Sequence, residues 1–264
     1  MLVVLENADY TAVVGSPDAP YLNSLVAQGA LATAYYSNVH PSIGNYFMLT
    51  AGGVVSTNDT YAGSVGPPEL ASVLTAAGKT WRVYAEGIPA AGYTGGDTGT
   101  YLKRHNPFAY FSDVAGTATA SNIVPLSQLA TDATTGLADF SMIVGNIYNV
   151  GHNCLPALSP CTTSVRVKQA DTWLRNALAP ILSSAALQQE SWLLAVTFDE
   201  SENDNTDGGG HVATVLVGTN VRPGYQAANS YQHQSLLRLM LESQGVSTLP
   251  NAAAGAPGMA EIWK

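Results

Sequence analysis

The chain has 264 residues, a formal net charge of −9 and only 11% charged residues. This length suits one domain with a sizeable core, so we expect a single domain over residues 1–264. The acidic balance, without any run of Lys or Arg, argues against nucleic-acid binding, which needs a basic stripe. No apolar stretch approaches the ~20 residues of a membrane span, so we predict no transmembrane segment.

Short apolar runs rich in branched residues alternate along the chain with segments of helical spacing. The runs predict buried strands at Leu2–Leu5, Ala30–Tyr36, Trp81–Ala85, Phe140–Val144, Trp192–Phe198 and Val212–Val217. Helices are predicted at Tyr21–Val26, Ile43–Leu49, Pro67–Leu74, Val124–Ala130, Ser164–Leu182 and Gln234–Leu241. This alternation predicts an α/β fold with a doubly wound, mainly parallel sheet that has helices on both faces.

Acidic and amide side chains end two of the predicted strands. Glu6 and Asn7 follow the first strand, and Asp199 and Glu200 follow the run that ends at Phe198. The carboxyl ends of parallel strands open into the crevice where α/β sheets bind ligands, so we expect these four side chains to converge. They form an all-oxygen set suited to one divalent cation, with Mg, Ca, Mn or Fe all compatible. Taken singly, each acidic residue could instead be a helix N-cap or the start of a solvated loop.

Ser42 stands at the start of a predicted helix. Pro41 restricts His40 to an extended conformation, and Ser42 can then cap the helix that begins at Ile43. A helix N-terminus favours a bound phosphate, and Asn45 lies on the same face, where its amide could contact the same anion. An ordinary capping serine with a solvent-facing Asn45 is the alternative.

Four segments of the chain occur in the order seen in the bacterial phosphoesterase family, which holds secreted acid phosphatases and phospholipases C. They are the Glu6-Asn7 strand end, His40-Pro41-Ser42-x-x-Asn45-Tyr46, Arg104-His105-Asn106-Pro107-Phe108 and Phe198-Asp199-Glu200-Ser201. The chain most resembles the small mycobacterial-type acid phosphatases, over residues 2 to about 249. The resemblance implies an alkaline phosphatase-like fold and hydrolysis of phosphate esters through a phosphoserine intermediate.

The resemblance also assigns roles to individual residues. Ser42, His105 and His152 are the expected catalytic residues. The expected substrate-binding residues are Asn45, His105, Asn106, His152 and His211, and the metal ligands are Glu6, Asn7, Asp199 and Glu200. Each histidine could instead lie in a surface loop, and His211 is evenly balanced between the two. His40 is expected to contact the site residues rather than the substrate itself. His233 is expected to cap the last helix.

The sequence departs from the family pattern at four positions. Gly44 stands where proline is usual, so we expect a looser turn around Ser42. Gly145 stands where proline usually precedes the residue that is Asn146 here. Asn153 replaces an aspartate after His152, which weakens the expectation that this neighbour tunes the histidine. Gly210 replaces an aspartate before His211 in the phospholipase branch.

Two cysteines, Cys154 and Cys161, lie in a proline-containing loop. A disulfide between them fits an oxidising compartment, and two free thiols are the alternative. A zinc site with His152 lacks an evident fourth ligand. We therefore expect a secreted or periplasmic protein whose export signal is absent from this sequence.

The expected reaction is hydrolysis of a phosphate monoester at a metal-assisted site, acting on a small phosphorylated substrate or a phospholipid head group. Rival hypotheses are a phospholipase C-like phosphodiesterase, a metal-free serine esterase and a non-catalytic anion-binding module. The esterase would lack the Gly-x-Ser-x-Gly turn typical of such enzymes. We expect the protein to be a monomer.

Overall fold

The computed structural model describes residues 1–264 and contains eight strands and eight α-helices. The strands are β1 (Leu2–Leu5), β2 (Ala30–Tyr36), β3 (Trp81–Ala85), β4 (Ile123–Pro125), β5 (Phe140–Val144), β6 (Leu193–Phe198), β7 (Thr214–Gly218) and β8 (Tyr225–Gln232). The helices are α1 (Tyr10–Val13), α2 (Pro20–Gln28), α3 (Ile43–Ala51), α4 (Leu70–Ala76), α5 (Gln128–Thr135), α6 (Thr163–Leu182), α7 (Ala185–Gln188) and α8 (His233–Glu242).

All eight strands form one sheet in the order β4-β3-β5-β1-β6-β7-β2-β8. Strand β1 lies near the middle, paired in parallel with β5 on one side and with β6 on the other. Strand β7 is antiparallel to both of its neighbours, β6 and β2, so the sheet is mixed but mainly parallel. The four residues of β1 are all buried, as expected for an apolar strand covered on both faces.

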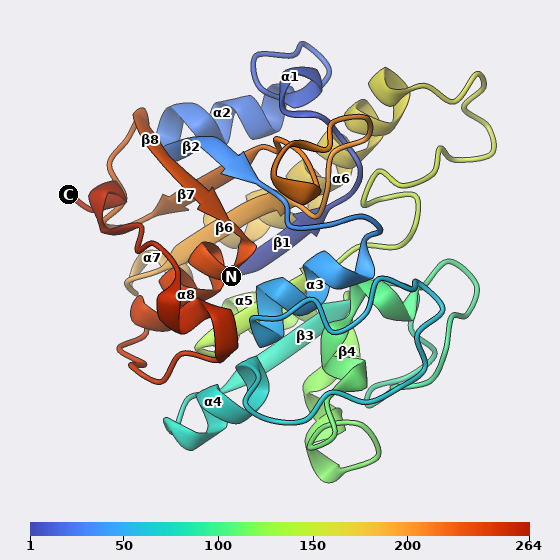
Figure 1. Ribbon diagram of the computed structural model, residues 1–264, viewed down its shortest axis with the longest axis vertical. Coiled ribbons are helices and arrows are strands. Elements are labelled where there is room, and N and C mark those ends of the chain that lie inside the picture. Colours follow the sequence, from blue (N-terminus) through green and yellow to red (C-terminus); the bar gives the residue numbers. More distant parts are fainter.

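Helices cover both faces of the sheet, which confirms the predicted α/β architecture. Helices α3 and α8 pack against each other in front of the sheet in Figure 1, and α5 and α6 lie behind it. Helix α2 packs on α6 and on β7. The buried side chains form one apolar cluster of 70 residues. None of the helices is both long enough and apolar enough to cross a membrane.

The predicted strands and most predicted helices are present, with ends within about three residues of the prediction. Two parts of the prediction are wrong. The segment Val124–Ala130, predicted as a helix, belongs partly to strand β4, and helix α5 begins only at Gln128. Strand β8 is not predicted from the sequence, because it is largely polar and mostly exposed. It is an edge strand paired only with β2.

Helix α2 begins without a capping side chain of its own. Its N-cap residue is Ala19, and Pro20 occupies the first turn. Asp171 of α6 supplies the missing acceptors: its two carboxylate oxygens accept hydrogen bonds from Tyr21 N at 3.0 Å and Leu22 N at 2.8 Å. Asp171 is buried, so these bonds join α2 to α6 across the back of the sheet.

Replacing Asp171 with Ala should therefore destabilise the fold. The substitution removes both acceptors from a buried helix start, and we expect the free energy of unfolding to fall by about 1–2 kcal/mol. Asp171→Asn keeps one acceptor oxygen and should lose less. Urea denaturation of both variants would measure the difference, with Glu190→Ala, an exposed acidic residue, as the control. A stability loss no larger for Asp171→Ala than for the control would contradict this capping role.

Candidate active site

The predicted acidic residues meet because of the register between β1 and β6. Leu5 pairs with Phe198, so Glu6 and Asp199 follow directly at the same edge of the sheet. Asp199 N donates to Leu5 O at 3.0 Å, and Asn7 N donates to Asp199 Oδ1 at 3.3 Å. Both carboxylates are buried. The expected convergence of these strand ends is therefore present in the structure.

Glu6 is held by two aromatic side chains. Tyr46 from α3 donates its hydroxyl hydrogen to Glu6 Oε1 at 2.9 Å. His105 Nε2 lies 2.6 Å from the same oxygen, and the His105 ring stacks on Tyr46 with centroids 5.3 Å apart. His105 is fully buried at the end of a short 3-10 helix, Lys103–His105. It is therefore placed to hold Glu6, and its expected contact with substrate would require the site to open.

His152 approaches Glu6 from the loop after β5 and is more open to solvent. Its Nε2 lies 4.0 Å from Glu6 Oε2, and the side chain is 28% exposed. Asn153 Oδ1 lies 2.8 Å from His152 Nδ1 and accepts a hydrogen bond from it. The contact expected of an aspartate in relatives is thus made by an uncharged amide, which directs Nε2 towards Glu6.

Glu86, at the carboxyl end of β3, fastens the loop that carries His152. Its Oε1 and Oε2 accept hydrogen bonds from Asn149 Nδ2 at 2.9 and 2.8 Å, and Oε2 also accepts one from Asn146 N at 3.0 Å. Asn146 Oδ1 in turn accepts bonds from Tyr148 N and Asn149 N, both at 3.0 Å. Because these bonds fix residues 146–149, they set the path by which the chain reaches His152.

Ser42 points at the second acidic strand end. Its hydroxyl donates to Glu200 Oε1 at 3.3 Å, and it is buried. His40 Nδ1 lies 2.8 Å from Glu200 Oε2, out of line for a hydrogen bond, and His40 Nε2 is 3.2 Å from the backbone oxygen of Asp204. Ser42, Glu200 and His40 therefore form a continuous polar row.

The expectation that Ser42 caps helix α3 is wrong. Ser42 has helical backbone angles and makes no capping hydrogen bond with its side chain. The N–H of Ile43 instead donates to Asp59 Oδ1 at 3.2 Å, and Arg104 lies 3.7 Å from the other oxygen of Asp59. A carboxylate already occupies this helix start, so the Ser42 hydroxyl is free to contact Glu200.

The buried carboxylates perturb one another. Burial, reinforced by repulsion from Glu6 and Glu200, raises the pKa of Asp199 well above its usual range. Burial and repulsion from Glu6 outweigh the attraction of His40 and raise the pKa of Glu200 to about 7. Burial also opposes ionisation of Glu6, but the contact with His105, together with the nearby His152 and Arg104, outweighs it and holds the pKa of Glu6 below its usual value. Negative charge thus concentrates on Glu6, and its two acidic neighbours tend to keep protons.

The four predicted metal ligands share one further property. Each has a buried side-chain oxygen without a hydrogen-bond partner: Glu6 Oε2, Asn7 Oδ1, Asp199 Oδ2 and Glu200 Oε2. Unpartnered buried oxygens are costly, and a hard cation would satisfy them. As the side chains stand, however, no three His, Cys, Asp or Glu groups are disposed to hold a metal ion. The donor chemistry fits a cation, but a closed coordination shell is not formed.

Asn45 has a different position from the one expected of a substrate ligand. Its Oδ1 accepts hydrogen bonds from Asn38 N at 3.0 Å and Val39 N at 3.2 Å, and its Nδ2 donates to Val39 O at 2.7 Å. The side chain is completely buried. The amide therefore anchors the turn that carries His40 and Ser42.

Two other expected substrate ligands are engaged elsewhere. Asn106 is completely buried and donates to the Tyr101 hydroxyl at 3.2 Å. His211 stacks on Tyr10 with centroids 4.1 Å apart, and its Nε2 lies 3.0 Å from Thr33 O. These contacts give His211 a structural role beside β2, the alternative that the sequence left open.

Three residues that shape the site have roles that the sequence did not predict. Tyr46 holds Glu6 and Glu86 holds the His152 loop, and neither was assigned a role from the sequence. The expectation that His233 caps the last helix is wrong, because the N-cap of α8 is Gln232 and no side chain caps it; His233 instead supports Asp199. His233 Nε2 lies 2.7 Å from Asp199 O and Nδ1 lies 3.0 Å from the Tyr35 hydroxyl; burial lowers the pKa of His233 to about 4. The rule that found Glu6 and Asp199 would also have found Glu86, because Glu86 directly follows a buried parallel strand.

The two glycines that replace proline permit close packing. A Cβ atom at Gly44 would lie 2.6 Å from Val39 Cγ2 and 3.1 Å from Val54 Cγ1. At Gly145 it would lie 2.9 Å from the ring of Trp173. The expectation that Gly44 loosens the Ser42 turn is therefore wrong, since the loop around Val54 packs into the space that a side chain would fill.

Gly210 also stands at a crowded position. Its φ is +85°, and a Cβ atom there would lie 2.1 Å from Ser201 Oγ and 2.3 Å from Asp204 O. Asp204 Oδ2 accepts a hydrogen bond from His211 N at 2.8 Å. A carboxylate thus does lie beside His211, supplied from a different segment of the chain.

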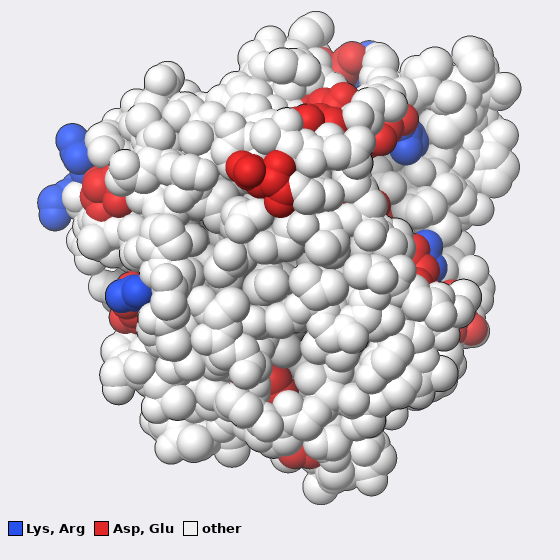
Figure 2. Space-filling view, in the orientation of Figure 1, with Lys and Arg blue, Asp and Glu red and all other residues white.

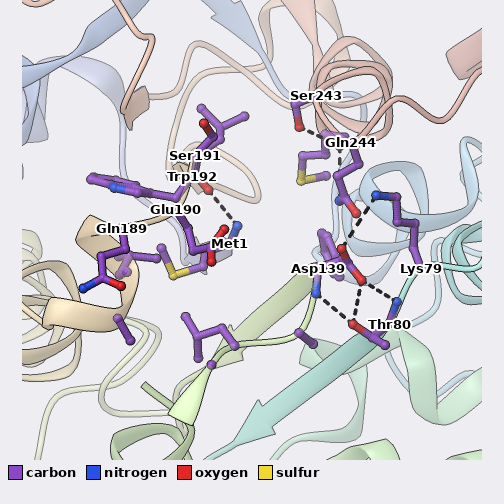
Figure 3. Close-up of a pocket in the computed structure, with 18 of the residues that line it drawn as sticks. Met1, Lys79, Thr80, Asp139, Gln189, Glu190, Ser191, Trp192, Ser243 and Gln244 are labelled. Carbon is purple, nitrogen blue, oxygen red and sulfur yellow. Dashed lines mark hydrogen bonds and ion pairs between the residues drawn. The ribbon is translucent and has the colours of Figure 1, made fainter. Parts of the chain in front are cut away.

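A cavity of about 550 Å³ lies at the opposite edge of the sheet (Figure 3). Its lining includes Met1, Thr80, Asp139 and Trp192, which immediately precede or begin strands β1, β3, β5 and β6. In this cavity, Asp139 Oδ2 accepts hydrogen bonds from Thr80 N at 2.8 Å and from Thr80 Oγ1 at 2.7 Å. Because the predicted site residues lie at the carboxyl ends of these strands, this cavity is separate from the candidate active site.

Comparisons with known proteins identify a family and a related enzyme. The model of the Phosphoesterase family matches residues 9–247. The phosphatidylinositol-3-phosphatase of Mycobacterium tuberculosis (strain ATCC 25618 / H37Rv) is 31% identical over 268 aligned residues, which cover 100% of this chain and 82% of the relative.

Solved structures share the fold at low sequence identity. A protein in the alkaline phosphatase superfamily from Vibrio parahaemolyticus superposes with a TM-score of 0.64 at 15% identity, covering 99% of this chain and 71% of that one. The lipoteichoic acid synthase LtaP from Listeria monocytogenes has a TM-score of 0.65 at 10% identity, covering 97% and 75%. These similarities establish an alkaline phosphatase-like fold.

The Glu86 contacts yield a test of how His152 is placed. Glu86→Ala frees residues 146–149, and we expect turnover of a phosphate ester to fall by roughly 10- to 100-fold, because His152 is an expected catalytic residue and small displacements of such a group are costly. Glu86→Gln retains one acceptor oxygen and should recover part of the loss. Initial rates over a range of substrate concentrations separate kcat from KM, with Glu190→Ala as the control. Turnover of Glu86→Ala equal to that of the control would show that the loop does not depend on Glu86.

Proposed function

The chain belongs to the Phosphoesterase family and is a phosphoric ester hydrolase, and we propose that it hydrolyses phosphate monoesters through a phosphoserine formed at Ser42. The observation that carries this proposal is the 3.3 Å hydrogen bond from the Ser42 hydroxyl to Glu200. A serine hydroxyl is a weak nucleophile unless a base accepts its proton. Glu200, whose pKa is raised to about 7, is suited to that exchange near neutral pH.

In the first step, Ser42 Oγ attacks phosphorus while its proton passes to Glu200. The bond between phosphorus and the ester oxygen breaks, and the leaving oxygen receives a proton from His152 or from water. In the second step, water attacks phosphorus and gives one proton to His152 or to solvent, whichever protonated the leaving oxygen. The bond between phosphorus and Ser42 Oγ breaks, Ser42 Oγ takes back its proton from Glu200, and phosphate leaves. Glu200 lies next to Ser42 in both steps, and His40 keeps its carboxylate in place.

The two site histidines have different roles in this mechanism. His152 is partly exposed and can direct Nε2 towards a phosphoryl or leaving-group oxygen. His105 is buried against Glu6, so it orients that carboxylate. The partial exposure of His152 and His40 marks the side from which a substrate would reach Ser42.

We further propose that Glu6, Asn7, Asp199 and Glu200 hold one divalent cation, with Mg, Ca, Mn or Fe as candidates. Support comes from the four unpartnered buried oxygens and from the mutual repulsion of the carboxylates. When bound, such an ion would offset this negative charge and favour the ionised Ser42 hydroxyl. Because the groups form no closed shell, binding requires the side chains to adjust.

The substrate is proposed to be a phosphorylated small molecule or a phospholipid head group. The mycobacterial relative is named as a phosphatidylinositol-3-phosphatase, and the disulfide between Cys154 and Cys161 supports export to an oxidising compartment. Rates on p-nitrophenyl phosphate and on bis(p-nitrophenyl) phosphate distinguish a monoesterase from a phospholipase C-like phosphodiesterase. Faster turnover of the diester would favour the second activity.

Ser42→Ala tests the nucleophile. We expect turnover of p-nitrophenyl phosphate to fall at least ~10³-fold while the melting temperature stays close to that of the wild type. Ser235→Ala is the matched control, because Ser235 is equally buried and its hydroxyl has no hydrogen-bond partner. Acid-quenched wild-type protein should carry one phosphoryl group on the peptide that contains Ser42. Wild-type activity of Ser42→Ala, or a phosphoryl group on another residue, would exclude this mechanism.

The proposed metal site predicts a pH-dependent gain in stability. The pKa of Glu200 is raised from 4.5 to about 7, so the metal-free folded protein keeps a proton that the unfolded chain loses, and its stability falls as pH rises through this window. A cation needs the ionised carboxylates, so it should raise the melting temperature clearly at pH 8 and little at pH 5. Thermal melts of chelator-treated protein with added Mg, Ca or Mn measure this effect. An Asp199→Asn variant should lose it, and equal shifts at both pH values would refute the site.

A further inference from the structure

The disulfide-closed loop between Cys154 and Cys161, which we call the apolar tip, presents two leucines to solvent. Leu155 is 42% and Leu158 is 40% exposed, and only one other large hydrophobic side chain, Val55, is similarly exposed. The connection between β5 and α6 that contains the tip projects from the body at the upper right of Figure 1. Exposed apolar side chains gathered at a projecting point mark a contact surface more often than scattered ones do.

The tip carries no charge. No Asp, Glu, Lys or Arg occurs between His152 and Arg166. The nearest basic groups are paired, Arg166 with Glu202 and Lys168 with Asp18 at 3.6 Å. Figure 2 shows the projecting lobe without coloured atoms, while acidic and basic groups lie at its base. Burial of the tip therefore requires no desolvation of a charged group.

The tip is held away from the core rather than folded onto it. The disulfide brings the two Cα atoms to 5.6 Å, and Leu158 N donates to Leu155 O at 2.8 Å within the loop. Gln169 of α6 anchors its base, since Oε1 accepts from Leu155 N at 2.9 Å and Nε2 donates to Asn153 O at 3.0 Å. These constraints preorganise the exposed leucines, so little conformational entropy is lost when they bind.

We propose that the apolar tip inserts Leu155 and Leu158 into the interfacial region of a neutral lipid layer. A lipid layer accepts apolar side chains without matching hydrogen bonds, and the tip offers few polar groups by which a protein partner could be recognised. The net charge of −9 and the uncharged tip disfavour an anionic surface. His152 lies two residues before Cys154, so insertion brings the side of the site that His152 occupies towards the lipid head groups.

Vesicle binding tests this contact without requiring turnover, so it is independent of the proposed function. Wild-type protein should sediment with phosphatidylcholine vesicles, and the Leu155→Ser/Leu158→Ser double variant should bind less by roughly tenfold or more, because each buried leucine contributes apolar transfer energy. Val55→Ser removes an equally exposed aliphatic side chain from another loop and should bind like the wild type. Added phosphatidylserine should not strengthen binding.

Two further measurements separate this contact from folding and catalysis. The double variant should keep wild-type turnover of soluble p-nitrophenyl phosphate, which shows that it is folded, and Ser42→Ala should bind vesicles normally. The proposal fails if the wild type does not bind phosphatidylcholine, if the double variant binds equally well, or if Val55→Ser loses as much binding. Association of the tip with a protein in the absence of vesicle binding would also overturn it.

Discussion

The parallel pairing of β1 with β6 is the constraint on which the candidate site depends. Backbone hydrogen bonds set Leu5 opposite Phe198 and thereby place Glu6 and Asp199 side by side in a buried position. The backbone positions of Glu6 and Asp199 are thereby fixed by the centre of the sheet. Other side chains must therefore compensate the charge: His105 and Tyr46 contact Glu6, and His40 and Ser42 contact the neighbouring Glu200.

This compensation is incomplete, because several buried oxygens of the candidate site have no hydrogen-bond partner. A core selected only for stability would not retain several buried oxygens without partners. Local rules fail most often where a protein performs chemistry, and here they fail at residues that the sheet forces together. By contrast, the residues that hold the site residues in place make hydrogen bonds with their side chains. Asn45 fixes the Ser42 turn, Glu86 fixes the His152 loop, and His233 bonds to the backbone of Asp199.

Much of the fold and the centre of the site followed from the sequence, because strand ends are local features. A short run of branched residues followed by an acidic residue identified both Glu6 and Asp199. The parallel topology then places these two residues at the same edge of the sheet. The direction of a side chain was not predictable in this way. Whether Ser42 caps its helix depends on Asp59, and whether Asn45 faces a ligand depends on Val39. Strand β8 could not be predicted, because its pairing with β2, rather than its own residue pattern, makes this segment a strand.

The packing around Gly210 limits how this chain could change over time. Introducing an aspartate there by a single substitution would place its Cβ 2.1 Å from Ser201 Oγ, at a φ of +85° that side chains rarely adopt. The turn from Ser201 to Asp204 would have to shift in the same lineage. Because Asp204 already supplies a carboxylate beside His211, the intermediate steps would lose one arrangement before gaining the other. The two segments are thus expected to evolve as a coupled pair.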